Sequence, residues 1–138
     1  QSHGTFISTD FTDDVDTIVA DIAPAYPEAK ELVSLKRTLI FNRKEQTLTV
    51  RDDVEFTSPQ TFETALVSFD ELSISGSIVT AAYQNAAVSA TVTAEGAGLA
   101  FTEGIVENPN AHSPKRIAVK LDKPVQKGSI TITFRIAK

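Results

Sequence analysis

The stretch Leu32–Phe56 constrains the fold more than any other, because apolar and polar residues alternate on both sides of one short polar turn. Alternation of this kind is typical of a β-strand with one buried face. The polar residues Arg43–Gln46 separate the two alternating runs. The stretch therefore predicts a long antiparallel β-hairpin. The residues expected on its apolar face are Leu35, Leu39, Phe41, Leu48, Val50, Val54 and Phe56.

Two charged residues, Arg37 and Asp52, interrupt the apolar face of this predicted hairpin. A turn centred on Lys44–Glu45 pairs Phe41 with Leu48 and, in the same register, Arg37 with Asp52. Removing an unpaired ion from water costs several kcal/mol, so the two opposite charges should neutralise each other. We expect Arg37 and Asp52 to form a structural ion pair that fixes the register. The alternative is that both side chains line a ligand site.

Short alternating runs separated by turns continue through the rest of the chain, and no run keeps a helical period. The runs Arg116–Leu121 and Ser129–Ile136 alternate most regularly, whereas Glu103–Pro114 is the one sizeable irregular loop. Roughly ten strands with a turn about every 8 to 12 residues are the pattern of an all-β sandwich. We therefore expect residues 1–138 to form one antiparallel two-layer β-sandwich of about ten strands.

Charge and composition narrow the expected partners. The net charge of −5 argues against nucleic acid, because no basic stripe is present to neutralise phosphates. The apolar runs are too short to span a bilayer, so we expect no membrane partner. The chain has no cysteine and two histidines, which leaves little for a transition-metal site. The acidic run Asp10–Asp16 lacks the glycine and terminal glutamate of an EF-hand, which favours a solvated turn. We expect no metal and no cofactor.

The chain lacks methionine, even at position 1. We therefore expect a chain that begins after processing or a fragment cut from a longer protein. The first residues, 1–4, read Gln-Ser-His-Gly and are treated as a tag remnant without functional weight.

Few residues offer catalytic or binding chemistry. His112 precedes Ser113 in the irregular loop, and a hydrolase built on it would need a hydroxyl or carboxylate within hydrogen-bond reach. Asp52 and Asp53 are adjacent on a strand and point opposite ways, so they cannot flank one glycosidic bond. Tyr26, Tyr83 and His112 are the candidate sugar contacts. The simpler interpretation places each tyrosine at the rim of the sandwich with its hydroxyl in water.

Several segments resemble the C-terminal portion of heparinase II/III-type polysaccharide lyases. They are Ala20–Pro27 (ADIAPAYP), Lys36–Phe41 (KRTLIF), Leu48–Asp53 (LTVRDD) and Pro114–Val119 (PKRIAV). The family pattern reads as an "aDlt-aYp" segment, an R-x-h-x-F strand, an "l-V-x-D" strand and a last hairpin. The resemblance covers most of the chain.

The resemblance implies a set of stacked antiparallel β-sheets that follows an α/α toroid. It also implies a bacterial, periplasmic or secreted parent enzyme that cleaves acidic polysaccharides by β-elimination. The family's catalytic Tyr, His and Asn lie in the toroid and at its junction with the central sheet, and none of those motifs matches this chain. The resemblance therefore implies a non-catalytic accessory module, the C-terminal fragment of a larger protein, with the catalytic domain of the same parent chain and an acidic polysaccharide as partners. A free-standing carbohydrate-binding or adhesive sandwich is the alternative.

Overall fold

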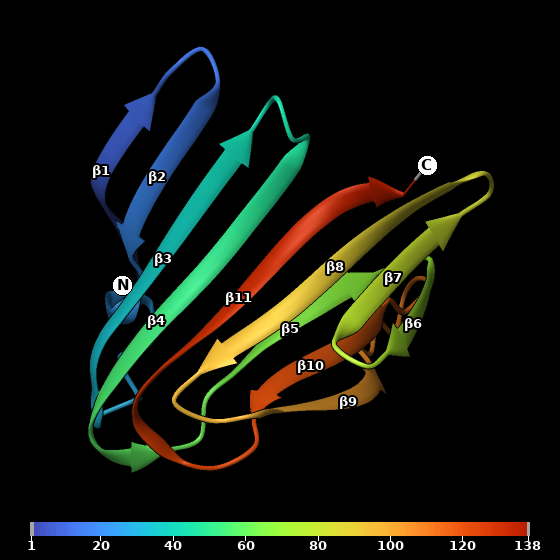
Figure 1. Ribbon diagram of the computed structural model, residues 1–138. Helices are drawn as coiled ribbons and strands as arrows, with labels where there is room; N and C mark the ends of the chain where they lie inside the picture. The colour runs from blue at the N-terminus through green and yellow to red at the C-terminus, as the bar shows by residue number, and fades with distance from the viewer. Residues whose placement is uncertain (1, 138) are drawn as a thin grey trace.

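The computed structural model describes residues 2–137, and almost all of its regular structure is β-strand (Figure 1). Gln1, the first residue of the expected tag remnant, lies outside the described residues. One short 3-10 turn, η1, spans Ala23–Ala25 and has a proline near its start, which presets its backbone. The strands in residues 2–137 are β1 Thr5–Phe11, β2 Val15–Asp21, β3 Leu32–Asn42, β4 Thr47–Gln60, β5 Glu63–Ser68, β6 Glu71–Ser75, β7 Ile78–Tyr83, β8 Ala86–Glu95, β9 Leu99–Ile105, β10 Lys115–Leu121 and β11 Val125–Ala137.

The strands form two antiparallel sheets that make two layers. One sheet has eight strands in the order β1-β2-β3-β4-β11-β8-β7-β6, and the other has three in the order β5-β10-β9. In Figure 1 the small sheet lies behind the half of the large sheet that contains β11, β8 and β7. The predicted all-β two-layer sandwich is confirmed, with eleven strands in the described residues where about ten are expected.

The strands β3 and β4 form the predicted hairpin, in the predicted register. Phe41 pairs with Leu48, and Leu39 pairs with Val50. The turn between the strands is the predicted Arg43–Gln46 segment, where Gln46 takes a positive φ of 53°. The regular alternation of apolar and polar residues in β3 and β4, together with the short turn between them, fixes this pairing locally.

Two expected strand ends are wrong. The strand β9 continues to Ile105, so the irregular loop expected over Glu103–Pro114 is shorter. Residues Leu99–Ile105 pair along the whole length of β10, and this pairing extends the strand. The last strand, β11, begins at Val125, earlier than the expected Ser129. Val125 pairs with Gln60 of β4, and the register of this pairing shifts between Val125 and Lys127.

The core lies between the small sheet and one half of the large sheet. We call the side of the large sheet that faces the small sheet its inner face. Val79, Val92 and Ile130 on this face are 1% exposed, and they belong to one cluster with residues of β10. The β10 residues of the cluster are Ile117, Val119 and Leu121. A smaller cluster of Leu35, Val54 and Phe56 packs against Ile22 and Ala23, in the segment that joins β2 to β3.

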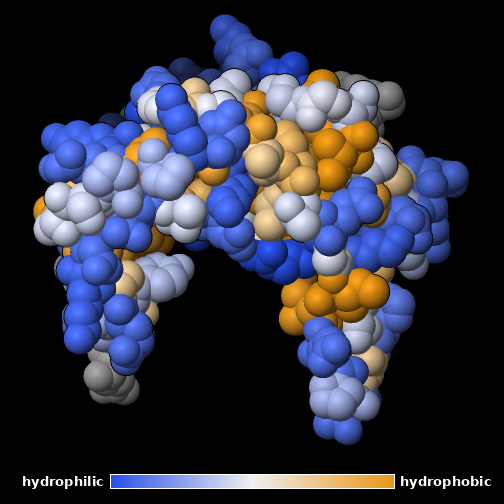
Figure 2. All heavy atoms as spheres, turned by 90° about the horizontal axis from the view of Figure 1, so that it is seen from below, coloured by the Kyte–Doolittle hydropathy of each residue, from blue (hydrophilic) through white to orange (hydrophobic). Residues whose placement is uncertain are grey.

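The other half of the inner face carries apolar side chains that remain accessible. The strand pairing from β1 to β4, and that of β11 with β8, places these apolar side chains on the same side of the sheet as the core. Phe41 is 44% exposed and Ile136 is 65% exposed. Seen from below, the molecule is hollowed between two projecting parts (Figure 2). We call the accessible apolar part of the inner face the open face. It comprises Phe6, Phe11, Ile18, Leu39, Phe41, Leu48, Val50 and Ile136.

Within residues 2–137, no helix has the length and hydropathy needed to cross a bilayer.

Candidate functional site: a groove beside the Arg37–Asp52 pair

A groove of about 430 Å³ lies between the two sheets, next to the segment that joins β2 to β3. Leu35 and Phe56 contribute apolar side chains from β3 and β4, and Phe62 contributes another from the approach to β5. The polar side chains that line the groove are Tyr26, Arg37, Asp52, Thr61, Glu63, Thr64 and Arg116.

The Arg37–Asp52 pair forms one wall of this groove. Arg37 Nε donates to Asp52 Oδ1 and Arg37 Nη2 donates to Asp52 Oδ2, each at 2.7 Å. The Asp52 side chain is 4% exposed, whereas the Arg37 side chain is 36% exposed. The two residues face each other across β3 and β4, as the hairpin register requires. A buried carboxylate is therefore held by a cation that remains accessible from the groove.

The ion pair keeps Arg37 charged. The hydrogen bond to Asp52 raises the pKa of the Arg37 guanidinium above its ordinary value, and the charge of Asp52 raises it further, while burial acts in the opposite direction. The charge of Tyr26 contributes last and least to the raised pKa of Arg37.

A second ion pair borders the groove at the β5 edge of the small sheet, on the side of that sheet that carries Val67. Arg116 Nη2 on β10 donates to Glu63 Oε1 on β5 at 2.5 Å. The Arg116 side chain is 35% exposed and that of Glu63 is 44% exposed. The sequence did not single out this pair, because its residues are 53 positions apart and no turn links their strands directly. The groove thus carries two guanidinium groups and two carboxylates.

The three candidate sugar contacts do not meet. Tyr26 lines the groove and is 52% exposed. Tyr83 is exposed at the end of β7, where the chain turns into β8. His112 lies in the loop between β9 and β10, with its ring 6.0 Å from that of Phe69. The structure therefore brings only Tyr26 to the groove.

His112 lacks the geometry that a hydrolase needs. The neighbouring Ser113 hydroxyl accepts a hydrogen bond from the Asn108 backbone N–H at 3.1 Å. Over residues 2–137, the contact observed for the His112 ring is with Phe69, not with a hydroxyl or a carboxylate. The hypothesis of a small hydrolase built on His112 therefore has no geometric support.

The acidic turn at Asp10–Asp16 is not gathered into a cation site. Asp16 forms a bidentate pair with Arg43, with Nη2 donating to Oδ2 at 2.5 Å. In the part of the chain that the structure describes, no three His, Cys, Asp or Glu residues are grouped so that they could hold a metal ion.

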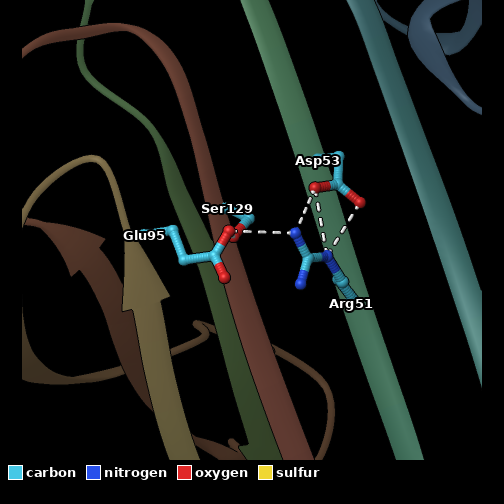
Figure 3. A network of polar contacts seen from close by, with 4 residues as sticks. All are labelled: Arg51, Asp53, Glu95 and Ser129. Atoms are coloured by element: carbon cyan, nitrogen blue, oxygen red, sulfur yellow. Dashed lines mark hydrogen bonds and ion pairs between the residues drawn. The ribbon is translucent and has the colours of Figure 1, made fainter.

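A polar network crosses the outer face of the large sheet, on the side away from the groove (Figure 3). Arg51 on β4 donates to Asp53 on the same strand and, at 3.1 Å, to Glu95 on β8. Ser129 on β11, which lies between those strands, is 3.5 Å from Glu95. The hydrogen bond to Asp53 raises the pKa of the Arg51 guanidinium above its ordinary value. The network joins three neighbouring strands, and Asp53, Glu95 and Ser129 also border a second hollow of about 380 Å³ on this face.

These features define the chain as a two-layer antiparallel β-sandwich whose groove contains paired charges. No family model matches the chain, and no curated protein matches it.

Solved structures do match it. The heparinase III-BT4657 gene product superposes with a TM-score of 0.71 at 14% identity, over 99% of this chain and 22% of that one. The same gene product with methylated lysines gives a TM-score of 0.73 at 12% identity, over 99% of this chain and 21% of that one. A mutant of the heparan sulfate lyase HepC from Pedobacter heparinus gives a TM-score of 0.71 at 14% identity, over 95% of this chain and 21% of that one.

The chain spans about a fifth of the length of these lyases. Its fold is that of a segment of heparinase III-type polysaccharide lyases, as the sequence resemblance indicates. At this level of identity the likeness establishes the fold, and the activity of the whole enzymes does not follow from it.

Proposed function

We propose that this chain is a non-catalytic structural module of a heparinase III-like lyase that acts on an acidic polysaccharide. In this proposal the open face packs against the catalytic part of the same parent chain. The parent enzyme would be periplasmic or secreted, as the resemblance implies.

The observation that carries the proposal is the open face. Monomeric proteins rarely leave a contiguous apolar surface uncovered unless something binds there. Here Phe41 is 44% exposed and Leu48 is 36% exposed, although both lie on the face that forms the core elsewhere in the sheet. The matched lyases are several times longer than this chain, so in them a segment of this fold has further chain available to cover such a surface.

The charges of the open face also suit a contact between parts of a protein. Arg43 forms an ion pair with Asp16, and its guanidinium carbon lies 5.6 Å from the centre of the Phe41 ring. Apolar side chains beside paired charges are typical of interfaces between domains.

The distribution of charge supports an accessory role. The net charge of −5 repels a polyanion, so this module alone is poorly suited to hold an acidic polysaccharide. The groove carries as many carboxylates as guanidinium groups, and each guanidinium is paired. Such an arrangement offers no excess positive charge for neutralising a uronate carboxylate during β-elimination.

The test is a lyase assay on the 138-residue chain alone. Heparan sulfate and alginate are incubated with the chain, and release of unsaturated uronate is followed by its ultraviolet absorbance, with a heparinase III as positive control. We expect no release above the rate without protein. Release that depends on protein concentration and disappears in a Tyr26→Phe or His112→Ala variant would refute the non-catalytic role.

A further inference from the structure

We propose that the groove binds one uncharged sugar ring, stacked on Tyr26 and hydrogen-bonded by the Arg37–Asp52 and Arg116–Glu63 pairs. This inference goes beyond the structural role and does not depend on it, because it concerns the chain by itself.

The groove has the form of a small-molecule site. Its volume of about 430 Å³ falls within the range of ligand pockets, which are mostly apolar with a few polar groups. Leu35, Phe56 and Phe62 supply the apolar part. The charged groups come from both sheets, so a ligand there would touch both layers of the sandwich.

The two ion pairs suit hydroxyl groups. A guanidinium has five N–H donors, and Asp52 accepts from two of those of Arg37. No other hydrogen bond of Arg37 is present within residues 2–137, and its side chain is 36% exposed, so donors remain for a ligand. The Glu63 side chain is 44% exposed, and its carboxylate offers acceptors beside Arg116. A hydroxyl donates and accepts at once, so adjacent donors and acceptors favour a polyol.

The same pairing disfavours an anion. An anionic group that drew Arg37 away would leave the carboxylate of Asp52, whose side chain is 4% exposed, buried without a counter-ion. Arg116 is likewise already neutralised by Glu63. With two cations and two anions, the groove attracts neither sign of charge. The ligand it fits is therefore an uncharged sugar and not a sulfated or uronate-containing one.

Tyr26 supplies a fixed aromatic surface at the mouth of the groove. Its backbone N–H donates to the Ala23 carbonyl at 3.0 Å, and its own carbonyl accepts from the Ala29 N–H at 3.1 Å. The side chain is nevertheless 52% exposed. A tyrosine ring whose backbone is held and whose surface is open can stack against the apolar face of a pyranose while its hydroxyl stays in water.

The experiment is a titration of the 138-residue chain, followed by NMR, with three disaccharides. Cellobiose and N,N′-diacetylchitobiose are uncharged, and an unsaturated sulfated heparin disaccharide is anionic. We expect at least one uncharged disaccharide to bind with a dissociation constant on the order of 1 mM, and the sulfated one to bind about tenfold more weakly or not at all. The Tyr26→Ala variant should weaken binding at least about tenfold.

Tyr83→Ala is the matched control, because Tyr83 is also an exposed tyrosine but lies outside the groove. It should bind as the native chain does, and the NMR spectrum of each variant verifies its fold. Absence of saturable binding up to about 20 mM would overturn the proposal, as would tighter binding of the sulfated disaccharide or equal losses in the two tyrosine variants. Each of these outcomes leaves the lyase assay unaffected, so failure of the groove proposal is distinguishable from failure of the accessory role.

Discussion

Asp52 accepts two hydrogen bonds from Arg37 across the β3–β4 pairing, both at 2.7 Å. Asp52 also lies opposite Ile130 of β11, at the middle of the eight-stranded sheet. A slip of one residue between β3 and β4 would move one of the two charges, with the apolar residues of its strand, to the wrong face. The pair therefore ties the register of the hairpin to the place where β11 joins it.

Removal of Arg37 should destabilise the fold. Breaking a buried ion pair from one side costs about 3–5 kcal/mol, because it leaves an uncompensated charge. The Arg37 side chain is 36% exposed, so water can reach the vacated site, and we expect Arg37→Met to lower the free energy of unfolding by about 2–3 kcal/mol. Urea denaturation followed by circular dichroism measures this change.

Two further variants serve as controls for this prediction. The double variant Arg37→Met/Asp52→Leu should recover most of the loss, because it leaves no buried charge. Arg43→Met removes the more exposed pair with Asp16 and should cost less than about 1 kcal/mol. A loss for Arg43→Met as large as that for Arg37→Met would show that the burial of Asp52 is not the cause.

The contribution of Arg37 to the free energy of unfolding should not change as the pH rises from neutral to moderately alkaline. Its pKa is raised in the folded state, chiefly by the hydrogen bond to Asp52, so the stabilisation is complete below the unfolded value. It is lost only as the pH rises through the higher folded value, and both values lie well above the pH range of this measurement. The difference in unfolding free energy between the native chain and Arg37→Met should therefore be constant from about pH 7 to 10. A difference that shrinks steadily over this interval contradicts this assignment.

Gly96 should tolerate no side chain. It follows β8 and has a φ of +91°, and a Cβ there would lie 2.6 Å from the Lys127 carbonyl oxygen. Left-handed backbone alone costs other residues about 1–2 kcal/mol, and here the backbone of Lys127 must also move. We expect Gly96→Ala to lower the free energy of unfolding by more than about 2 kcal/mol.

Gly76 is the matched control for Gly96. Its φ is also positive, at +59°, but beyond its own chain neighbours no atom lies within 4 Å of the place that a Cβ would take. Gly76→Ala should therefore cost only the backbone term of about 1 kcal/mol. Equal costs at the two glycines, measured by thermal or urea denaturation, would show that the close approach to Lys127 has no energetic weight.

The small sheet should be stabilised through one face only. Ile117 is 1% exposed on the core side of β10, whereas Val67 on the neighbouring β5 is 55% exposed. Truncation of a buried Ile to Ala typically costs about 2–5 kcal/mol, and we expect this range for Ile117→Ala. Val67→Ala should remain within about 0.5 kcal/mol. Comparable losses would mean that the outer side of the small sheet is also covered.

The local features of the fold were predictable from the sequence, and the reason is visible in the hairpin. A strict alternation on both sides of a four-residue turn leaves one register that keeps Leu39, Phe41, Leu48 and Val50 on one face. The order of the strands was not predictable in this way. The strand β11 lies between β4 and β8, and its pairing joins Thr133 to Thr49, residues far apart in the sequence.

The groove could be predicted only in part, because contacts between residues far apart in the sequence leave no local pattern. The Arg37–Asp52 pair depends on a local hairpin, whereas Arg116 and Glu63 come from a second sheet whose position the sequence does not encode locally. Nor does any sequence pattern separate Tyr26, which lines the groove, from Tyr83, which is exposed elsewhere. That distinction depends on how the two sheets are packed.

The most direct test of the central claim is a measurement of thiol accessibility on the open face. The chain has no cysteine, so Leu48→Cys introduces a unique thiol there, and Thr91→Cys introduces one on an exposed site of the opposite side of the same sheet. The rate of labelling by a maleimide is compared between the 138-residue chain and the longer parent chain that the proposed function requires. We predict that labelling at the Leu48 site slows more than about tenfold in the parent while labelling at the Thr91 site is unchanged. Equal labelling of the Leu48 site in both proteins would contradict the claim that the open face is covered by the rest of the enzyme.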